Sequence, residues 1–550
     1  MNEKDVLQVK LFYSSVVLIF FACSIFSQTG FQIPSDVYLE HLYSGSPEAR
    51  PYLNYRTLSD KLPAGNNFDG ADKLDVFAPG APLSFGKVLL RLHMPSVYAS
   101  WNSTVPYGQN DGSLWQGRGF NSSLIAGFTA SYAGFEATFK PQLTCSQNTA
   151  FELIPSAYSG PGFEDKADTW GYYGIGSIDA PQRFGDLPLY AFSWGESEIR
   201  YSYKTLTVGF GTQSVWLGPA RINPILHSDN ASPYPKIDIG LRRQEISLLG
   251  YHAGDVEFRS WWGKLSESEY FDNDSANDHN LLTAVSFSFA PSFMSGFTFG
   301  FHRTMLSDWE AADYSSVLTL LWPFMKQSAG SDERDQRASL TFQYELPKVD
   351  LNLYLEWGRN DYSPSLDYII RYPFHTQGYT VGGEKGFVIP VAGGLDSRLL
   401  IELTNLESSR DLEFLWKQTF YGHHKILQGY TNEGQWLGAG MGTGGNSQYL
   451  ALETMYPNGI IRLFFQRVNP DNDYVWFMNM WGDRPEKRSD EYKFRADLAY
   501  GIQGIHAIHN SAILSYRIAL IDSHNYDYQA NVSSIHRYNV HLASGFTFRF

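Results

Sequence analysis

The clearest indication of the fold is the stretch Tyr538-Asn-Val-His-Leu-Ala-Ser-Gly-Phe-Thr-Phe-Arg-Phe550 at the end of the chain. Every second residue of this stretch, apart from one serine, is aromatic or aliphatic, and the residues between them are polar or small. Because side chains alternate between the two faces of a strand, the stretch predicts a strand with one apolar face. It is long enough to cross a bilayer as a tilted strand. The terminal Phe550 is typical of the signal that outer-membrane barrels present to the barrel-assembly machinery, which we therefore expect as a partner.

The same period of two recurs along the chain, often in pairs of segments joined by a short turn. The clearest examples are 199–203 with 206–210, 285–289 with 297–301, 340–346 with 349–357, and the long segment 492–502. Two such strands joined by a short turn predict a β-hairpin. Charged residues on the face opposite the apolar one require a hydrated interior. We therefore predict an all-β fold, a large transmembrane antiparallel β-barrel of about 18 strands, in the range of roughly 16 to 20.

Long polar stretches alternate with the short turns. The longest are 102–119, 156–188, 266–280 and 328–337. This alternation matches the two unequal rims of an outer-membrane barrel. The alternative is a large soluble β-sandwich or propeller. It is disfavoured by the terminal phenylalanine, by the export signal described next, and by the lack of a repeat of fixed period.

The amino end has the pattern of a secretory signal peptide over residues 1–27: a charged start, a short apolar run and a small-residue exit. We expect cleavage near Ser27 or Gln28. A membrane anchor helix is disfavoured because the apolar run is at the short limit for spanning a bilayer. A lipid-modified Cys23 is disfavoured because Phe20 stands where a small aliphatic residue is usual.

The mature chain is expected to have two parts. Residues 28–85 contain a short helix-like pattern after Pro34-Ser35-Asp36 and predict a small N-terminal periplasmic helical segment. Residues 86–550 are expected to form the barrel. Cys145 is the one cysteine left after cleavage, so no internal disulfide is expected.

The composition fits a barrel exposed to lipid. Aromatic residues make up 16% of the 550 residues, and there are 49 glycines. Such a content suits an all-β protein with the aromatic girdles of outer-membrane barrels, and membrane lipid is an expected partner. The net charge of −15 argues against nucleic acid as a partner, because phosphate binding requires a basic face.

Three inserts break the strand pattern. The first, residues 105–119, reads VPYGQNDGSLWQGRG. The second, residues 213–235, reads QSVWLGPARINPILHSDNASPYP and follows an expected strand. The third contains Y-G-H-H from Tyr421 and G-Y-T-N-E-G-Q-W-L-G from Gly429.

Together these inserts resemble the capsule assembly protein Wzi family over most of the mature chain, from about residue 31 to Phe550. The W-L-G-P segment ending in S-D-N-A-x-P-x-P is the most specific part of the resemblance. The resemblance implies a large monomeric barrel with an N-terminal helical bundle. It also implies a lectin-like, non-catalytic role in attaching and organising exported capsular polysaccharide at the cell surface. This chain is longer than the best-known members, so the extra residues are expected to enlarge surface loops.

The inserts contain residue types that suit sugar binding. Trp rings offer flat apolar platforms for sugar faces, and Asn, Asp and Arg offer hydrogen-bonding groups for hydroxyls. Arg118 and Arg221 could also pair with uronate carboxylates, since a guanidinium fork matches a carboxylate. The candidate polysaccharide-binding residues are Asn110, Asp111, Trp115, Arg118, Trp216, Arg221, Asn223, Asp229 and Asn230.

Each group also has a purely structural interpretation. The Trp residues could serve packing, and Arg118 and Asp111 could form an ion pair inside the barrel. Glycine allows a positive φ and proline fixes φ, so several residues of the inserts are expected to set backbone shape. These are Gly112, Gly117, Gly119, Gly218, Pro219 and Pro233.

No catalytic or metal motif stands out. The sequence has no G-x-S-x-G, H-E-x-x-H or P-loop pattern. His423 and His424 are adjacent, so on a strand they would point to opposite faces. We predict a barrel that binds polysaccharide, with no turnover, metal or cofactor. The alternatives are a diffusion porin or transporter, a barrel hydrolase acting on lipid or glycan, and a structural barrel whose loops serve adhesion.

Overall fold

The structure is a computed structural model. It describes residues 83–154, 170–174, 178–272, 275–310, 334–360, 366–390, 394–409, 419–456, 459–480, 492–509, 512–529 and 536–548. The expected signal peptide, nearly all of the expected helical segment and the terminal Phe550 lie outside these residues. The last residues of that segment, Leu83–Phe85, form strand β1.

The described chain consists mainly of antiparallel strands. In the first half these are β1 (Leu83–Phe85), β2 (Val88–Asn102), β3 (Gly119–Tyr132), β4 (Phe135–Phe139), β5 (Gln142–Ser146), β6 (Leu189–Ser193), β7 (Glu198–Tyr203), β8 (Leu206–Gly211), β9 (Lys236–Leu248), β10 (Tyr251–Ser266) and β11 (His279–Pro291). In the second half they are β12 (Phe297–Asp308), β13 (Arg334–Leu346), β14 (Leu351–Asn360), β15 (Gln377–Ile389), β16 (Leu395–Asn405), β17 (Thr431–Asn432), β18 (Gln435–Trp436), β19 (Asn446–Tyr456), β20 (Gly459–Asn469), β21 (Ala496–His509), β22 (Ala512–His524) and β23 (His536–Phe548).

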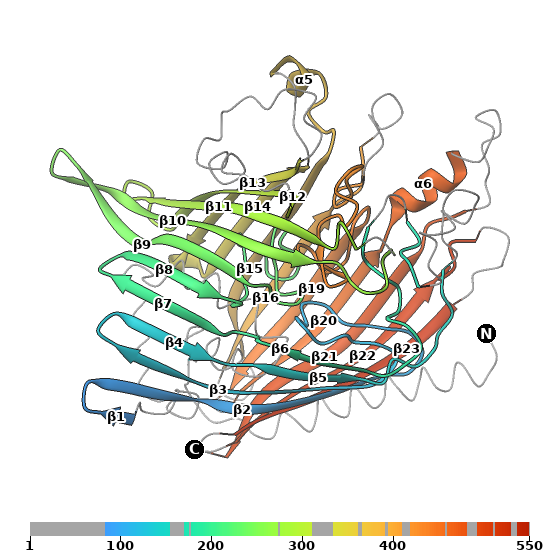
Figure 1. Cartoon of the computed structure of the whole chain (residues 1–550), viewed down its shortest axis with the longest axis horizontal. Helices are drawn as coiled ribbons and strands as arrows, with labels where there is room; N and C mark the ends of the chain where they lie inside the picture. The colour runs from blue at the N-terminus through green and yellow to red at the C-terminus, as the bar shows by residue number, and fades with distance from the viewer. Residues whose placement is uncertain are drawn as a thin grey trace.

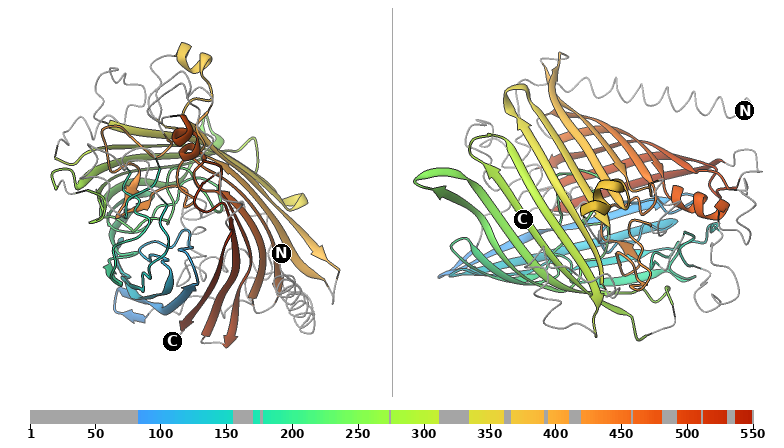
Figure 2. Two further views of the ribbon diagram at one scale, coloured as in Figure 1. Left: turned by 90° about the vertical axis from the view of Figure 1, so that its right-hand side faces the viewer. Right: turned by 90° about the horizontal axis from the view of Figure 1, so that it is seen from above.

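The strands close into a barrel, as predicted (Figure 1). The first long strand, β2, pairs with the last, β23, so that Ser96 lies opposite Thr547 and Asn102 opposite His541. β4 and β5 both pair with β3, and on their other side β4 pairs with β7 and β5 with β6. β4 and β5 therefore form one interrupted strand of the barrel, and β6 and β7 form the next one. Counting each interrupted strand once, and leaving aside the short hairpin partner β1, the barrel has 18 antiparallel strands. Figure 2 shows the blue-to-green wall and the orange-to-red wall from two further sides.

The two faces of the barrel wall follow the sequence pattern. On β23, the side chains of Tyr538, Leu542 and Phe546 are exposed, whereas Asn539 and His541 are 0% and 1% exposed. The apolar face therefore points outward and the polar face points into the barrel. This arrangement suits a wall that contacts lipid outside and polar groups inside.

The predicted hairpins are confirmed. β7 and β8 meet at Lys204–Thr205, where Lys204 has a φ of 55°. β11 pairs with β12, and β13 pairs with β14 across the 3-10 turn η3 (Pro347–Val349). Each of these pairs is joined by a short turn, which sets the register of its two strands.

The strand expected over 492–502 begins later than predicted. β21 starts at Ala496, and Tyr492 forms only an isolated bridge with Gln529. The side chain of Asn479 accepts from the backbone N–H of Tyr492 (3.1 Å) and donates to its carbonyl (2.8 Å). This local bonding to the end of helix α6 (Asn472–Met480) competes with the strand ladder, and periodicity alone does not reveal it.

Long connections gather at one rim, together with α6 and the short helix α5 (Leu366–Arg371), as Figure 1 shows. The backbone N–H of Tyr474 donates to the Asp471 carboxylate (3.0 Å), which caps the start of α6. Within the described part of the chain, no helix is long and apolar enough to cross a bilayer.

A hydrophobic core lies inside the barrel at the level of the inserts. It joins inward side chains of β10, β11 and β12 (Trp261, Leu282 and Leu306) to buried residues of the second and third inserts. Those insert residues are Val215, Leu217, Ile225, Leu226, Ala231, Tyr234, Phe420, Tyr421, Ile426, Tyr430, Leu437 and Ala439. We call residues 105–119, 213–235 and 419–442 the lumen plug.

Candidate functional site

The three parts of the lumen plug bind one another through their backbones. The N–H of Gly112 donates to the carbonyl of Asp229 (2.8 Å), which joins the first insert to the second. The N–H of Ser228 donates to the carbonyl of Leu437 (2.8 Å), which joins the second to the third. The Asn230 amide adds a bond to the carbonyl of Trp436 (3.2 Å). Segments that are far apart in sequence therefore form one unit.

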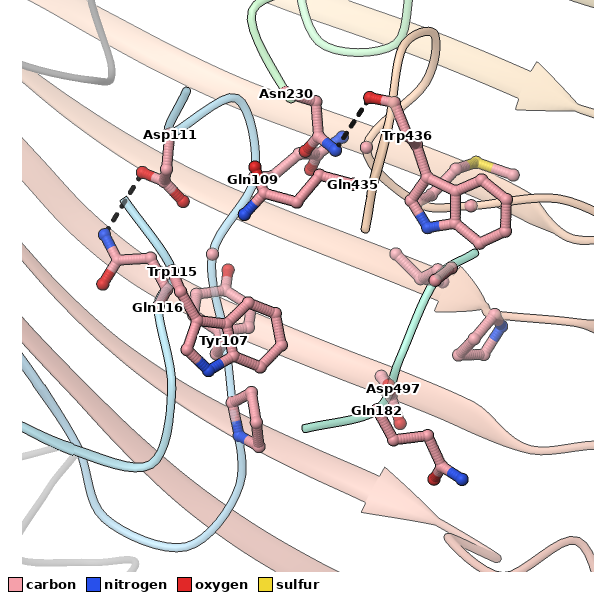
Figure 3. A pocket seen from close by; sticks show the side chains of 18 of the residues that line it. Tyr107, Gln109, Asp111, Trp115, Gln116, Gln182, Asn230, Gln435, Trp436 and Asp497 are labelled. Carbon is pink, nitrogen blue, oxygen red and sulfur yellow. Dashed lines mark hydrogen bonds between the residues drawn. The ribbon is translucent and has the colours of Figure 1, made fainter. Parts of the chain in front are cut away.

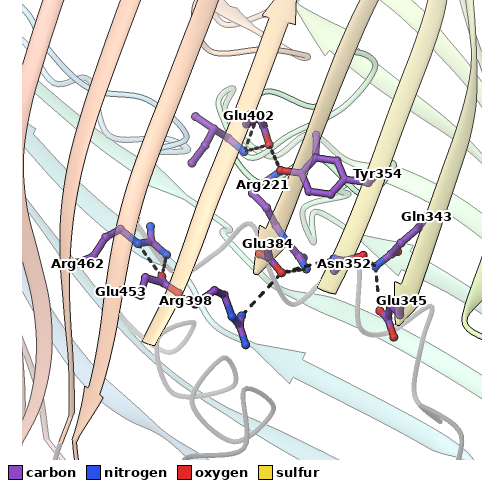
Figure 4. A network of polar contacts seen from close by, with 12 residues as sticks. Arg221, Gln343, Glu345, Asn352, Tyr354, Glu384, Arg398, Glu402, Glu453 and Arg462 are labelled. Atoms are coloured by element: carbon purple, nitrogen blue, oxygen red, sulfur yellow. Dashed lines mark hydrogen bonds and ion pairs between the residues drawn. The ribbon is translucent and has the colours of Figure 1, made fainter. Parts of the chain in front are cut away.

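Buried carboxylates of the barrel wall hold the second insert. Glu402 of β16 accepts the backbone N–H groups of Arg221 (2.6 Å), Ile222 (3.1 Å) and Asn223 (2.8 Å). Glu384 of β15 accepts both ends of the Arg221 guanidinium fork, at 2.9 and 3.3 Å (Figure 4). Charge-assisted bonds of this kind are about twice as strong as neutral ones, so the insert is fixed firmly against the wall.

Glu356 of β14 provides a further anchor. It accepts the backbone N–H of Ile225 (2.9 Å), and its side chain is 0% exposed. Gly218 lies close by with a φ of +81°, which supports its predicted role in backbone shape.

Gly218→Ala is expected to destabilise the folded barrel by about 1–2 kcal/mol from backbone strain, plus a steric cost. A Cβ at this position would lie 3.1 Å from Thr341 Cγ2 and 3.2 Å from Glu356 Oε2. Gly250→Ala is the matched control, since its φ is +85° but a Cβ there meets nothing within 4 Å. Urea unfolding followed by tryptophan fluorescence should show the larger loss for Gly218→Ala. Equal losses would contradict the close packing of the plug.

A cavity of about 330 Å³ opens between the lumen plug and the barrel wall (Figure 3). Its lining combines aromatic rings with side-chain amides. The rings belong to Tyr107, Trp115, Tyr172, Tyr173 and Trp436, and the amides to Gln109, Gln116, Gln182, Asn230, Gln435 and Gln466. Flat apolar rings beside amide donors and acceptors suit a ligand with apolar faces and many hydroxyls.

The charged groups of the cavity are already partnered. Arg495 binds Asp497 through two parallel bonds of 2.8 Å, and its guanidinium also lies over the Tyr526 ring at 4.3 Å. The amide of Gln116 donates to Asp111 (3.2 Å). Arg495 is the one basic residue among the described lining residues, and a carboxylate neutralises it. The cavity therefore presents hydrogen-bonding groups without a free positive charge.

A buried acid supports the cavity wall from behind. The Tyr172 hydroxyl donates to Asp471 (2.6 Å), the residue that caps α6. Burial raises the pKa of the Asp471 carboxyl above its usual range. Burial likewise raises the pKa of the Tyr107 hydroxyl. These groups position the aromatic lining: the Tyr172 hydroxyl donates to Asp471, and the Tyr107 hydroxyl accepts from the Arg517 guanidinium (3.3 Å).

Comparison of the sequence with known protein families identifies the family of this chain. The family model of capsule assembly protein Wzi matches residues 99–487, which is well over half of the chain. The chain belongs to the Wzi family. The matched range contains all three parts of the lumen plug, and it confirms the resemblance carried by the inserts. No curated protein sequence matches the chain significantly.

The chain is also similar to solved structures of β-barrel proteins. One is Wzi of Escherichia coli, described as an outer membrane protein involved in group 1 capsule assembly and a carbohydrate-binding β-barrel. It is 14% identical, with a TM-score of 0.53, and the match covers 83% of this chain and 84% of that one. Another is OccD3 (OpdP) of Pseudomonas aeruginosa, at 8% identity and a TM-score of 0.39, covering 86% and 93%. At these identities the Wzi structure supports the fold alone.

The structure of this Wzi family member divides the predicted binding residues into two groups. Asp111, Trp115 and Asn230 line the cavity. Asn110 instead donates to the carbonyl of Ile222 (3.0 Å) and lies within the plug. Asn223 and Asp229 also lie within the plug, each 1% exposed.

The remaining predicted residues make contacts elsewhere. The Trp216 ring is 1% exposed and donates to the carbonyl of Ala220 (3.1 Å). Arg118 donates to the carbonyls of Ser103 (3.2 Å) and Ala150. Because the Arg221 fork binds Glu384, both arginines that could have paired with uronates have partners in the protein.

The shape-setting residues behave in different ways. Gly112 and Gly119 have φ values of 61° and 94°, which glycine adopts without strain. Gly117 has another role, because a Cβ there would lie 2.7 Å from Nε1 of Trp115. Its lack of a side chain lets the indole edge approach the backbone, and this approach orients the ring that lines the cavity.

Several cavity residues were not among the sequence candidates. Gln109, Gln116 and Trp436 lie inside the recognised inserts, so their residue types were a usable signal. Tyr172 lies in a long loop with no such motif. Arg495 lies just before β21, and nothing in its local sequence distinguishes it from other charged residues that face a barrel interior.

Proposed function

We propose that this chain is a non-catalytic outer-membrane barrel that binds capsular or other surface polysaccharide and helps to attach or assemble it at the cell surface. The observation that carries the proposal is the cavity, which is built from the family's own inserts and lined by aromatic rings and amides. Sugar rings have apolar C–H faces, which rest on aromatic platforms, and hydroxyls, which pair with amides. The description of the Escherichia coli Wzi as a carbohydrate-binding β-barrel supports the same role.

The charge of the lining favours hydroxyl-rich sugar units over uronates. A carboxylate ligand would need a free guanidinium or ammonium group to offset its desolvation. Arg495, Arg221 and Arg118 already have protein partners. Asp111 lines the cavity and adds a negative group. The binding unit we propose is therefore a neutral stretch of the polymer.

The size of the cavity suits a short segment of a long polymer. At about 330 Å³ it is at the lower end of ligand pockets, which span roughly 300 to 1,000 Å³. One such contact is weak. A repeating polymer that engages many barrels on one cell is nevertheless retained strongly, because each bound unit raises the effective concentration of the next.

The remaining parts of the proposal rest on the sequence patterns at the two ends of the chain and on the resemblance to the family. The chain is exported by its N-terminal signal peptide, inserted by the barrel-assembly machinery and held in the outer membrane by its apolar outer face. It acts as a monomer, with lipid around it and polysaccharide as its ligand. No cofactor takes part.

Binding and retention test this proposal together. Detergent-solubilised protein on a glycan array should bind neutral, hydroxyl-rich oligosaccharides and leave uronic acid polymers unbound. Deleting the gene in a capsulated host should shift polysaccharide from the cells to the medium. Unchanged cell-bound and released polysaccharide would contradict the role. Cleavage of the bound glycan, detected as new reducing ends, would instead indicate a barrel hydrolase.

A further inference from the structure

Three potential metal ligands gather where β22 and β23 reach the long-loop rim. They are Asp522 and His524 on β22 and His536 on β23. All three are partly exposed. They occupy even-numbered positions of β22 and β23, as do Tyr538 and Val540, and these positions face outward from the barrel wall. The cluster is therefore separate from the lumen plug and its cavity.

The ligand atoms are close enough to share one ion. Asp522 bridges the two rings: one carboxylate oxygen lies 2.8 Å from His536 Nδ1, and the other lies 3.2 Å from His524 Nε2. The two imidazole rings have centroids 4.1 Å apart. One atom from each residue can be chosen so that all of them lie within 4.8 Å of one another. Small side-chain rotations would bring these atoms to the separations found between ligand atoms that each lie about 2.0–2.2 Å from one zinc ion.

Strand pairing fixes this arrangement. His524 and His536 are direct cross-strand partners, and Asp522 precedes His524 by two residues, so it points to the same face. The ring of Tyr538, the next outward residue on β23, stacks beside His536 at 5.9 Å and 21°. The backbone of the site is thus part of the barrel ladder, and only side-chain rotations separate it from a coordinating geometry.

We propose that Asp522, His524 and His536 form a binding site for a divalent transition metal of the zinc class. Imidazole nitrogens and a carboxylate oxygen are ligands that zinc prefers, whereas calcium and magnesium require mostly oxygen ligands. Three protein ligands leave a fourth tetrahedral position open to water or to an anionic group. The ion would join the ends of β22 and β23 next to the seam where β23 meets β2.

Zinc binding to the whole chain tests the site. Chelator-treated protein in detergent is titrated with zinc chloride in a calorimeter, and the melting temperature is followed with and without zinc. We expect one zinc ion per chain and a rise in melting temperature. His536→Ala should weaken binding by at least about 10-fold, since even changes to residues behind the ligands cost 10- to 100-fold in affinity. Cobalt in place of zinc should give the visible spectrum of a four-coordinate site, and His536→Ala should abolish it.

Two further variants keep the test decisive. His524→Gln removes a second ligand and should have the same effect as His536→Ala. His252→Ala is the matched control, because His252 also pairs with a carboxylate, that of Asp255 (3.0 Å), but lies outside the three-residue cluster. It should leave zinc affinity unchanged. Heat-modifiable migration in gels confirms that each variant is a folded barrel. Absence of zinc binding, or equal affinity in all variants, would overturn the proposal.

Discussion

Glu402→Gln is expected to release the second insert from the barrel wall and so open the lumen to ions. Glu402 is 1% exposed, and its two oxygens accept backbone N–H groups of Arg221 and Asn223 and the hydroxyl of Tyr354 (2.8 Å). An amide in its place turns one acceptor into a donor that faces other donors. Bonds to a charged group contribute about 1.5–3 kcal/mol each, and unsatisfied buried donors add a desolvation cost. We expect a loss of about 3 kcal/mol or more in the docking of the insert.

Single-channel recording in planar bilayers measures the opening directly. The wild-type barrel, with its plug in place, should give small currents, and Glu402→Gln should give larger and less steady ones. Limited proteolysis should cut the variant within 213–235, a segment that is largely buried in the intact barrel.

Glu453→Gln is the control for this experiment. Glu453 also lies on the barrel wall, where it pairs with Arg462. The change removes a similar charge without touching the N–H groups of the insert. If both variants conduct like the wild type and resist protease equally, Glu402 does not hold the plug. Large, steady currents from the wild type would favour a porin.

The barrel could be predicted from the sequence because strand patterns are local. On β23 apolar residues alternate with polar or small ones, apart from one serine, and from Tyr538 onward the burial of each residue follows its parity. In the β7–β8 hairpin, the paired strands are also neighbours in sequence, joined by a two-residue turn between Tyr203 and Leu206. In such cases the residues that fix the structure lie within a few positions of one another.

The site could be predicted only in part, because its contacts join distant residues. The inserts were recognised as unusual, and Arg221 was considered a possible partner for uronates. Its partner in the protein, Glu384, lies 163 positions away, so no local pattern reveals it. The cavity likewise combines Trp115 with Arg495, which no local pattern connects. The metal cluster was missed for a related reason. Asp522 and His524 are two residues apart, so a strand places them on the same face. His536 joins them only through the pairing of β22 with β23, which the sequence does not show.

Trp115→Ala is expected to weaken polysaccharide binding by about 10- to 30-fold, because it removes an aromatic platform from the cavity. The indole N–H edge lies against Gly117, where a Cβ would come within 2.7 Å of Nε1, so the N–H does not face a ligand. The ring also packs edge-on against Phe184 with centroids 4.9 Å apart. Its contribution to binding is therefore its apolar surface.

Trp115→Phe separates that contribution from a hydrogen bond, because phenylalanine keeps a ring and has no N–H. We expect Trp115→Phe to retain most of the affinity, within about 3-fold of the wild type, since most of the aromatic contact remains. Trp101→Ala is the matched control, because Trp101 lies on the outward face of β2 with 43% of its surface exposed. Calorimetric titration with a purified oligosaccharide of the host's own capsule gives the affinities. Wild-type affinity in Trp115→Ala would place the glycan elsewhere on the barrel. Equal losses in Trp115→Phe and Trp115→Ala would mean that the indole N–H binds the sugar, so that its edge must turn away from Gly117.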